Sequence, residues 1–210
     1  LQAIHVPKTI DNDLPITDCC PGFGSVAKYV AVSALEASFD VKSMSLTSTK
    51  VFVMEVMGRH AGWIAAAGGL LEDHGVPVVI LFPEIVFDQK KFLARVDQLV
   101  KKHGYCTVIV SEGCPHAAGT FLAAQGRPDA LGDAQLGGAE PVVANMIKEA
   151  LGYKFHWAVA DYLQRAARHI ASKTDVHQAY ELGQKAVELA LAGKNAVMPT
   201  IDRISDAPYK

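Results

Sequence analysis

The chain has 210 residues, half of them apolar, and its formal net charge at pH 7 is -2. This composition provides enough apolar material for a sizeable core and argues against a disordered chain. The near-neutral charge argues against nucleic acid as the main partner, because proteins that bind phosphate backbones carry a basic excess. The longest apolar run, at residues 76–82, is far shorter than the roughly 20 residues of a membrane span, so we expect no membrane association.

Short apolar runs rich in valine and isoleucine alternate along the chain with longer amphipathic segments. The short runs predict four strands: Ala3–Val6, Val51–Val56, Val76–Phe82 and Cys106–Val110. The amphipathic segments predict five helices: Ser25–Phe39, Ala61–Leu71, Gln89–His103, Pro141–Leu151 and Thr174–Ala192. Strands that are apolar on both faces and alternate with helices are typical of βαβ units. The pattern therefore predicts an α/β fold with a mostly parallel sheet.

The last helix has the clearest pattern, because apolar residues recur in it every three to four positions from Val176 to Leu191. Asp175 stands near its start and Gly193 just past its end, as helix boundaries favour. By contrast, residues 112–140 are rich in glycine and contain two prolines. This segment predicts a long loop, and long loops inside compact domains often carry function.

The cysteines and the first residues bear on the origin of the chain. Cys19, Cys20, Cys106 and Cys114 have neither the paired spacing of a zinc site nor the density of a secreted disulfide scaffold. We therefore expect reduced thiols in a cytoplasmic protein. The chain begins with Leu1, inside a predicted strand that nothing precedes, and we expect a fragment of a longer protein.

Polar residues with phosphoryl-transfer chemistry follow the first predicted strand. In open α/β sheets ligands bind beyond the carboxyl ends of the strands. Lys8 and Thr9 stand there with two carboxylates, Asp11 and Asp13. One carboxylate can accept the proton of an attacking hydroxyl, the other can hold Mg²⁺, and the ammonium can neutralise a phosphate. An ordinary turn is an equal alternative, because Asp-Asn-Asp is also favoured by turn chemistry.

Two further places follow the next predicted strands. Gly58, Arg59 and His60 stand between a strand and a helix, where backbone amides favour anions. The alternative is that Gly58 and Gly62 only permit tight packing of the strand against the helix, and on this motif alone it is the better interpretation. Glu112 follows the strand Cys106–Val110 and suits hydrogen bonds to sugar hydroxyls, although an isolated Glu-Gly pair is a weak signal.

A dense basic cluster lies near the last helix. It consists of Arg165, Arg168, His169 and Lys173. Arginine grips a phosphate by two parallel hydrogen bonds, so the cluster favours phosphate binding. Ordinary surface charge is the alternative. The histidines show no i, i+4 pair that would indicate zinc, and no Walker-type phosphate loop occurs.

In their order and content these motifs resemble the phosphofructokinase family over nearly the whole chain. Thr9 to Asp13 is similar to the catalytic loop of the family, and Met57-Gly58-Arg59 is similar to its sugar-phosphate loop. Glu112-Gly113 resembles the sugar-hydroxyl contact. Leu163-Gln164-Arg165 resembles the clamp on the 6-phosphate.

The resemblance implies a role for each matching residue. Asp11 would be the general base for the 1-hydroxyl of fructose 6-phosphate, and Asp13 would help to hold Mg²⁺. Thr9 would contact the transferred phosphoryl group, and Arg59 would face that group or the sugar. The remaining substrate contacts implied by the resemblance are Met57, Gly58, Glu112, Tyr162 and Arg165.

Lys8 indicates the branch of the family. Members that use ATP usually carry glycine before the Thr-Ile-Asp-Asn-Asp loop, whereas members that use pyrophosphate carry lysine, as here. The resemblance thus implies reversible phosphoryl transfer from pyrophosphate to fructose 6-phosphate, a step of glycolysis. An ATP-dependent phosphofructokinase and a non-catalytic regulatory relative are the alternatives. The second is disfavoured because Asp11 and Asp13 are retained.

The sequence also departs from the family pattern. The glycine-rich loops that bind the donor phosphates would lie before Leu1. Lys50 and His156 stand where many relatives have arginines, one of which reaches the 6-phosphate from a neighbouring subunit. Because a histidine is only partly charged near pH 7, we expect weaker or pH-sensitive substrate binding.

The resemblance implies two Rossmann-like, three-layer α/β domains with the active site between them. Residues 1–22 would be part of the phosphoryl-donor domain, residues 23–162 would form the sugar-phosphate-binding domain, and residues 163–210 would return into the donor domain. A homodimer or homotetramer is expected, because bridging residues complete neighbouring sites.

Overall fold

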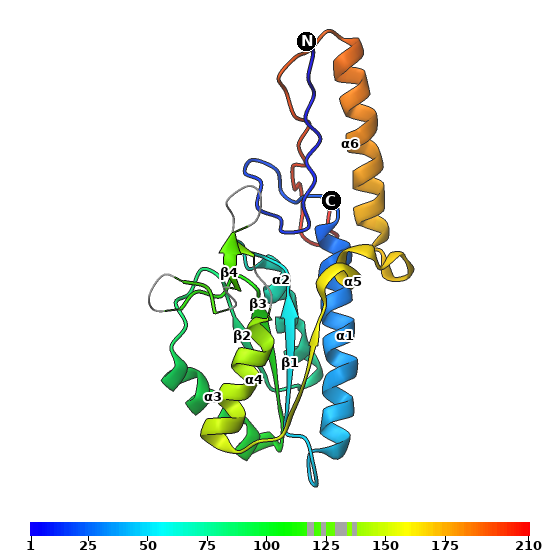
Figure 1. The fold of residues 1–210 in the computed structure, drawn as a ribbon. Coiled ribbons are helices and arrows are strands. Elements are labelled where there is room, and N and C mark those ends of the chain that lie inside the picture. Colours follow the sequence, from blue (N-terminus) through cyan, green and yellow to red (C-terminus); the bar gives the residue numbers. More distant parts are fainter. Residues whose placement is uncertain (117–119, 123–124, 129–133, 136–137) are drawn as a thin grey trace.

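A four-stranded parallel sheet forms the centre of the chain (Figure 1). The computed structural model describes residues 1–210 except 117–119, 123–124, 129–133 and 136–137. The strand order is β2-β3-β1-β6. The strands are β1 (Val51–Val56), β2 (Val78–Leu81), β3 (Cys106–Ser111) and β6 (Phe155–Val159). All neighbours run parallel, so the carboxyl ends of the four strands meet at one edge.

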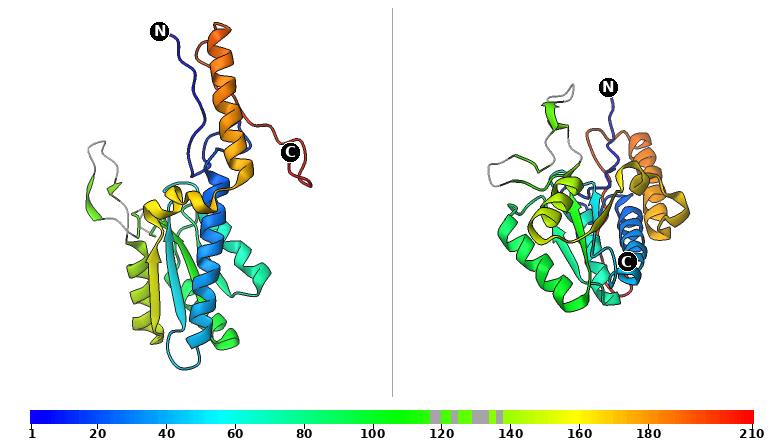
Figure 2. Two further views of the ribbon diagram at one scale, coloured as in Figure 1. Left: turned by 90° about the vertical axis from the view of Figure 1, so that its right-hand side faces the viewer. Right: turned by 60° about the horizontal axis from the view of Figure 1, so that its bottom comes forward.

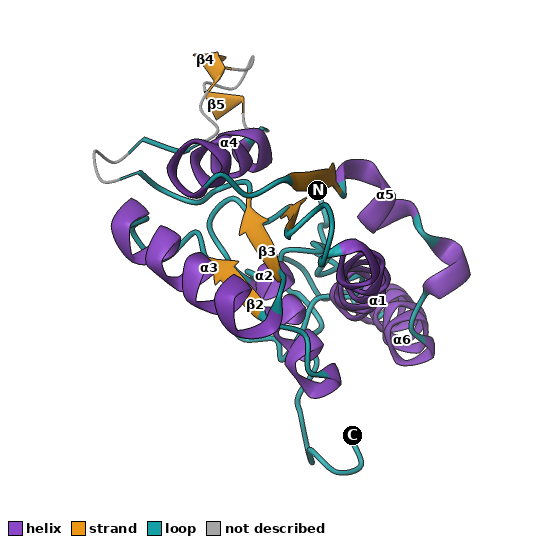
Figure 3. Ribbon diagram, turned by 90° about the horizontal axis from the view of Figure 1, so that it is seen from below, coloured by secondary structure: helices purple, strands orange, loops and turns teal. Residues whose placement is uncertain are grey.

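Helices cover both faces of this sheet and produce three layers (Figure 3). One face packs against α1 (Phe23–Met44), α2 (Trp63–Ala66) and the 3₁₀ helix η1 (Ala67–His74). The other face packs against α3 (Gln89–His103) and α4 (Ala139–Leu151).

The strands are apolar on both faces because both faces are covered. Along β1, Val51 and Val53 enter the core beneath α3 and α4. Phe52 and Met54 enter the core beneath α1.

The rest of the chain projects beyond the carboxyl end of the sheet (Figures 1 and 2). Its main element is α6 (Lys173–Leu191), which is reached through α5 (Asp161–Ala166) and a 3₁₀ turn, η2 (Arg168–Ile170). The N-terminal segment lies beside the segment that follows α6, through an isolated parallel bridge between Ile4 and Val197. The chain near Ile4 and the chain near Val197 therefore lie side by side, outside the four-stranded sheet.

Most of the predicted elements are confirmed. The structure has the predicted α/β class and the mostly parallel sheet. The bounds of β1, α3 and α6 agree with the predicted ones within a residue or two, and β2 is shorter than predicted. Asp88 explains the sharp start of α3, because its carboxylate accepts a hydrogen bond from Lys91 N. The second domain of the expected pair stays a prediction.

Other expectations were wrong. Ala3–Val6 forms only the bridge at Ile4, because a single neighbouring segment offers too few partners for a ladder. The helix expected at Ala61–Leu71 is one short α-helix followed by the 3₁₀ helix η1. The strand β6 was not expected. The predicted loop at 112–140 contains a short antiparallel pair, β4 (Gln125–Pro128) and β5 (Ala134–Gln135), and several of its residues lie outside the described ones.

Among the residues that the structure describes, no helix has both the length and the apolar character that crossing a membrane requires.

Candidate functional site

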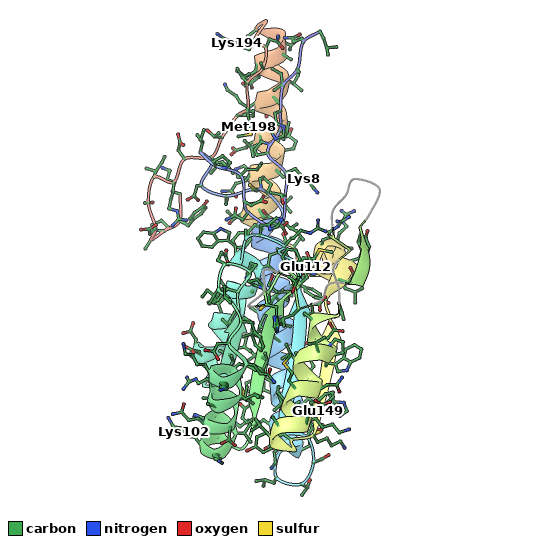
Figure 4. All side chains as sticks on the ribbon, turned by 60° about the vertical axis from the view of Figure 1, so that its left-hand side comes forward. Lys8, Lys102, Glu112, Glu149, Lys194 and Met198 are labelled. Carbon is green, nitrogen blue, oxygen red and sulfur yellow. The ribbon has the colours of Figure 1, made fainter. Side chains whose placement is uncertain are left out.

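The motifs singled out in the sequence meet at the carboxyl edge of the sheet. Glu112, after β3, lies where the projecting part joins the sheet, and Lys8, on the N-terminal segment, lies above it in the projecting part (Figure 4). Lys102 and Glu149 mark the opposite end of the molecule (Figure 4). A parallel sheet brings such loops to one edge although they are far apart in sequence.

The catalytic-loop motif is a turn held by its own side chains. Thr9 Oγ1 accepts a hydrogen bond from Asp11 N at 3.1 Å, and Asn12 Oδ1 accepts one from Cys20 N at 2.8 Å. Asn12 has a φ of 57°, a left-handed conformation that asparagine tolerates well. The motif is therefore a turn, as turn chemistry favours, and this turn can also serve catalysis because it carries Asp11 and Asp13.

Charged groups from two segments surround Asp11. Burial raises the pKa of its carboxyl above the ordinary value, and the charge of Asp13 raises that pKa further. The side chains of Lys8, Arg59 and His60 lower it. Interactions of this kind require proximity, so the structure brings these residues together around one half-buried carboxyl.

Glu112 is joined to the loop that follows β1. Its Oε1 accepts a hydrogen bond from Gly58 N at 3.3 Å. Burial raises the pKa of the Glu112 carboxyl, the hydrogen bond from Gly58 lowers it, and the charge of Asp11 raises it. Ser111, fully buried at the end of β3, donates a hydrogen bond to the Gly58 carbonyl and accepts one from Gly113 N at 3.2 Å. These contacts fix the two loops against each other.

Two glycines make this close approach possible. A Cβ on Gly113 would lie 1.9 Å from the carbonyl oxygen of Arg59, inside the van der Waals distance. Gly58 has a φ of +124°, and a Cβ there would lie 2.6 Å from the Ala61 carbonyl oxygen. The sequence left tight packing and anion binding as alternatives for the Gly58 motif. In the structure Gly58 is needed for tight packing, because any Cβ there would meet a backbone carbonyl.

The short helix α5 carries the predicted phosphate clamp. The guanidinium of Arg165 lies 4.6 Å from the centre of the Tyr162 ring, and both side chains are exposed. Between them Gln164 points inward and is only 2% exposed. Its Oε1 accepts from Met57 N at 3.3 Å and its Nε2 donates to Asp161 O at 2.9 Å. Gln164 thereby ties the clamp to the sugar loop.

A small cavity lies between these elements. Its volume is about 150 Å³. The residues that line it come from β1, β6, α5 and the positions next to β1, β3 and α4: Glu55, Val56, Met57, Glu112, Gly138, Val159, Asp161 and Gln164. A larger cavity of about 470 Å³ lies beside α6 and residues 199–202, away from the motifs. Of the predicted site residues, Met57 and Glu112 line the smaller cavity, so it marks the side of the site on which the sugar is expected.

Two of the predicted substrate contacts lie elsewhere. Lys50 precedes β1, at the amino edge of the sheet, and its Nζ donates a hydrogen bond to the Ser45 carbonyl. His156 lies on the edge strand β6, pairs with Phe52 and is exposed. Neither joins the cluster around Asp11 within this chain.

Three residues that sequence reasoning did not select take part in the site. Gln164 stood inside a quoted motif, yet nothing in the sequence shows that its side chain points inward. Ser111 ends an apolar strand. Glu55 is a carboxylate within the buried run of β1, and that placement was a signal that could have been used.

A hard cation would find oxygen ligands at this edge. No group of three or more histidine, cysteine, aspartate or glutamate side chains suited to a metal occurs among the described residues. Mg²⁺ usually takes only one or two carboxylates and completes its shell with water and substrate phosphates. The turn that presents Asp11 and Asp13 fits this requirement.

Comparison with known proteins agrees with the motifs. A family model described as Phosphofructokinase matches residues 1–190. A pyrophosphate--fructose 6-phosphate 1-phosphotransferase from Methylococcus capsulatus is 68% identical over 212 residues, which cover 100% of this chain and 50% of the relative. An ATP-dependent 6-phosphofructokinase 1 from a Nostoc species is 33% identical, over 92% of this chain and 51% of that protein.

A solved structure is similar over the same extent. The crystal structure of a pyrophosphate-dependent phosphofructokinase from Nitrosospira multiformis matches with a TM-score of 0.89 and 68% identity, over 100% of this chain and 50% of that one. The chain thus spans about half the length of the curated relatives that it matches.

Proposed function

The chain belongs to the phosphofructokinase family, and on this premise we propose that it serves phosphoryl transfer from pyrophosphate to the 1-hydroxyl of fructose 6-phosphate. The product would be fructose 1,6-bisphosphate, and the step would be a reversible part of glycolysis. The observation that carries the proposal is the half-buried carboxyl of Asp11 with Lys8 and Arg59 around it. The donor assignment is supported by 68% identity to a pyrophosphate-dependent relative, against 33% to an ATP-dependent one.

Asp11 would act as the general base. Its carboxylate would take the proton of the 1-hydroxyl as the hydroxyl oxygen forms a bond to phosphorus. The bond from that phosphorus to the bridging oxygen of pyrophosphate would break, and orthophosphate would leave. Lys8 and Arg59 would stabilise the charge on the transferred group, with Thr9 beside it, because positioned cations are the main catalytic device of phosphoryl transfer.

The sugar would lie against the carboxyl ends of β1 and β3. Glu112 and the backbone at Met57 and Gly58 offer partners for its hydroxyls. Arg165, held beside the Tyr162 ring, would take the 6-phosphate through paired hydrogen bonds.

Mg²⁺ would be held by Asp13, as the family resemblance implies. Bound there, it would neutralise charge on the phosphates of the donor. Asp13 is exposed and its charge acts on Asp11, so both carboxylates face the same region.

We propose the domain layout on the same basis. Residues 1–22 and 163–210 would belong to the donor domain, and residues 23–162 to the sugar-phosphate domain. The projecting arrangement of α6 beside the N-terminal segment supports this division (Figure 2). Lys50 and His156 would serve a neighbouring subunit of a homodimer or homotetramer. The four cysteines form no disulfide, which suits the reducing cytoplasm, where we propose that the protein acts.

The first experiment compares donors. The product of the gene that carries these 210 residues is assayed for fructose 1,6-bisphosphate with Mg²⁺, fructose 6-phosphate and either pyrophosphate or ATP at matched concentrations. Turnover with pyrophosphate alone is expected. Turnover with ATP alone would overturn the donor assignment, and turnover with neither donor would favour a non-catalytic relative.

A variant pair tests the general base. Asp11→Asn should keep fructose 6-phosphate binding and lose about 10² to 10⁴ in turnover, the usual contribution of a positioned base. Asp40→Asn, the same change on an exposed residue of α1, is the control and should leave turnover unchanged. Turnover of Asp11→Asn near the parent value would contradict the assignment.

A further inference from the structure

Glu55 is a buried carboxylate that joins β1 to α4. Its side chain is only 3% exposed, because β1 lies in the middle layer of the molecule and helices cover both of its faces. Its Oε2 accepts hydrogen bonds from the backbone N–H groups of Ala139 at 2.6 Å, Gly138 at 3.1 Å and Glu140 at 3.2 Å. The first N–H groups of a helix have no partner within the helix and carry partial positive charge. Glu55 satisfies these groups, which compensates for the burial of its own charge.

A second carboxyl lies against the first. Glu140, in the first turn of α4, is also 3% exposed. Burial raises the pKa of Glu140 to about 8, and its hydrogen bond to Glu55 and the charge of Glu55 act in the same direction. The raised pKa favours the neutral form of Glu140, which can donate a hydrogen bond to Glu55. The Oε2 atom of Glu140 is buried and has no hydrogen-bond partner among the described residues. Adjacent buried carboxyls favour the neutral form of one partner, in agreement with the raised pKa of Glu140.

Glu55 and the residue before α4 form one wall of the proposed sugar pocket, and Glu140 is bonded to that wall without lining the pocket. Glu55 and Gly138 line the 150 Å³ cavity together with Met57 and Glu112. Glu55 lies near enough for its charge to raise the pKa of Glu112. A shift of Glu55 or of the first turn of α4 would therefore change the space and the charge that the sugar meets.

We propose that Glu140 is a positioning residue, which holds Glu55 and the first turn of α4 in place behind the sugar pocket. The proposal rests on the proposed function, in that the ligand is fructose 6-phosphate. Among the described residues, the carboxyls near the pair are Glu55 from β1, Glu112 after β3, and Asp161 at the start of α5. The cation Arg59 acts on Glu112. A second negative charge on Glu140 would therefore be repelled and would loosen the wall.

The experiment measures the Michaelis constant for fructose 6-phosphate as a function of pH. An acid with a pKa of about 8 is about nine-tenths neutral at pH 7 and about one-tenth neutral at pH 9. If only the neutral form holds the wall, the Michaelis constant of the parent rises about tenfold over this interval. Glu140→Gln keeps a donor for Glu55 and cannot ionise, so its constant should match the parent at pH 7 and change less than twofold by pH 9. The Michaelis constant for pyrophosphate is the internal control and should not follow this titration.

A second measurement covers the case in which the variant folds poorly. In the folded parent Glu140 holds its proton more tightly than in the unfolded chain. The contribution of this residue to the free energy of unfolding therefore falls as the pH rises from about 4.5 to about 8. The difference in unfolding free energy between Glu140→Gln and the parent should grow in favour of the variant over that range. A purely structural packing role would give a constant difference.

The outcomes separate this proposal from the proposed function. A parent with no turnover and no calorimetric binding of fructose 6-phosphate at any pH refutes the proposed function. An active parent whose Glu140→Gln variant shows the same alkaline rise as the parent overturns the role of Glu140, as does a parent with no rise at all.

Discussion

Replacing Gly113 with alanine should disable the site while leaving most of the fold intact. The added Cβ would lie 1.9 Å from the Arg59 carbonyl oxygen and 2.5 Å from the Arg59 carbonyl carbon. Real Cβ contacts stay beyond 3.0 Å, so the Arg59 oxygen must retreat by about 1.1 Å, the difference between these two distances. The obstacle is backbone and not the end of a flexible side chain, so it cannot swing aside.

Two magnitudes follow from that shift. Overpacking of this kind costs about 1–3 kcal/mol in the free energy of unfolding. A misplacement of about 1 Å in catalytic machinery costs on the order of 10² in turnover. We therefore expect Gly113→Ala to fold, to lose about 1–3 kcal/mol in urea unfolding, and to lose about a hundredfold in kcat for the pyrophosphate reaction.

Gly75→Ala is the matched control. Gly75 ends η1 at the opposite edge of the sheet with a φ of +69°, and a Cβ there meets nothing within 4 Å. Its left-handed conformation costs a non-glycine residue about 1–2 kcal/mol, so the control loses similar stability without touching the site. The reasoning fails if Gly113→Ala keeps kcat within twofold of the parent, or if Gly75→Ala loses as much activity.

Three further predictions concern other parts of the molecule. Lys8→Gly should raise the Michaelis constant for pyrophosphate much more than that for fructose 6-phosphate, and equal effects would count against the donor role. Gln164→Glu keeps an acceptor for Met57 N and loses the donor to Asp161 O. The Michaelis constant for fructose 6-phosphate should then rise roughly tenfold with that for pyrophosphate unchanged, and an unchanged sugar constant would refute the link. Asp175→Asn weakens a buried cap at the start of α1, where the carboxylate accepts three hydrogen bonds. The free energy of unfolding should fall by about 1–3 kcal/mol in urea titrations with kcat unchanged, and an unchanged unfolding midpoint would contradict this.

Local signals in the sequence were sufficient for the interior elements. β1 and β3 are apolar on both faces and buried throughout, so their runs could be recognised without knowledge of their neighbours. α6 carries its own start signal, since Ser172 accepts a hydrogen bond from Asp175 N. The edge strand β6 has mostly exposed residues and owes its existence to pairing with β1. No local pattern shows such pairing.

The candidate site divides in the same way. Residue types in motifs identified Lys8, Asp11, Arg59 and Glu112. The parallel sheet brings Arg59 and Glu112 to one edge, and the N-terminal segment, which lies outside the sheet, brings Lys8 and Asp11 near them. The supporting contacts could not be predicted, because they join distant positions. Gln164 is separated from its partner Met57 by 107 residues.

The hydrogen bonds at the site also bear on how such an enzyme diversifies. The loops on the sugar side are bonded to one another through Ser111, Glu112 and Gln164. The bonds of Thr9 and Asn12 stay within the N-terminal segment. A mutation on the sugar side therefore disturbs several loops at once and is exposed to strong selection. The N-terminal segment has fewer such contacts, so under the proposed function a change in the residues expected to meet the donor would disturb the rest of the site less than a change among the sugar contacts.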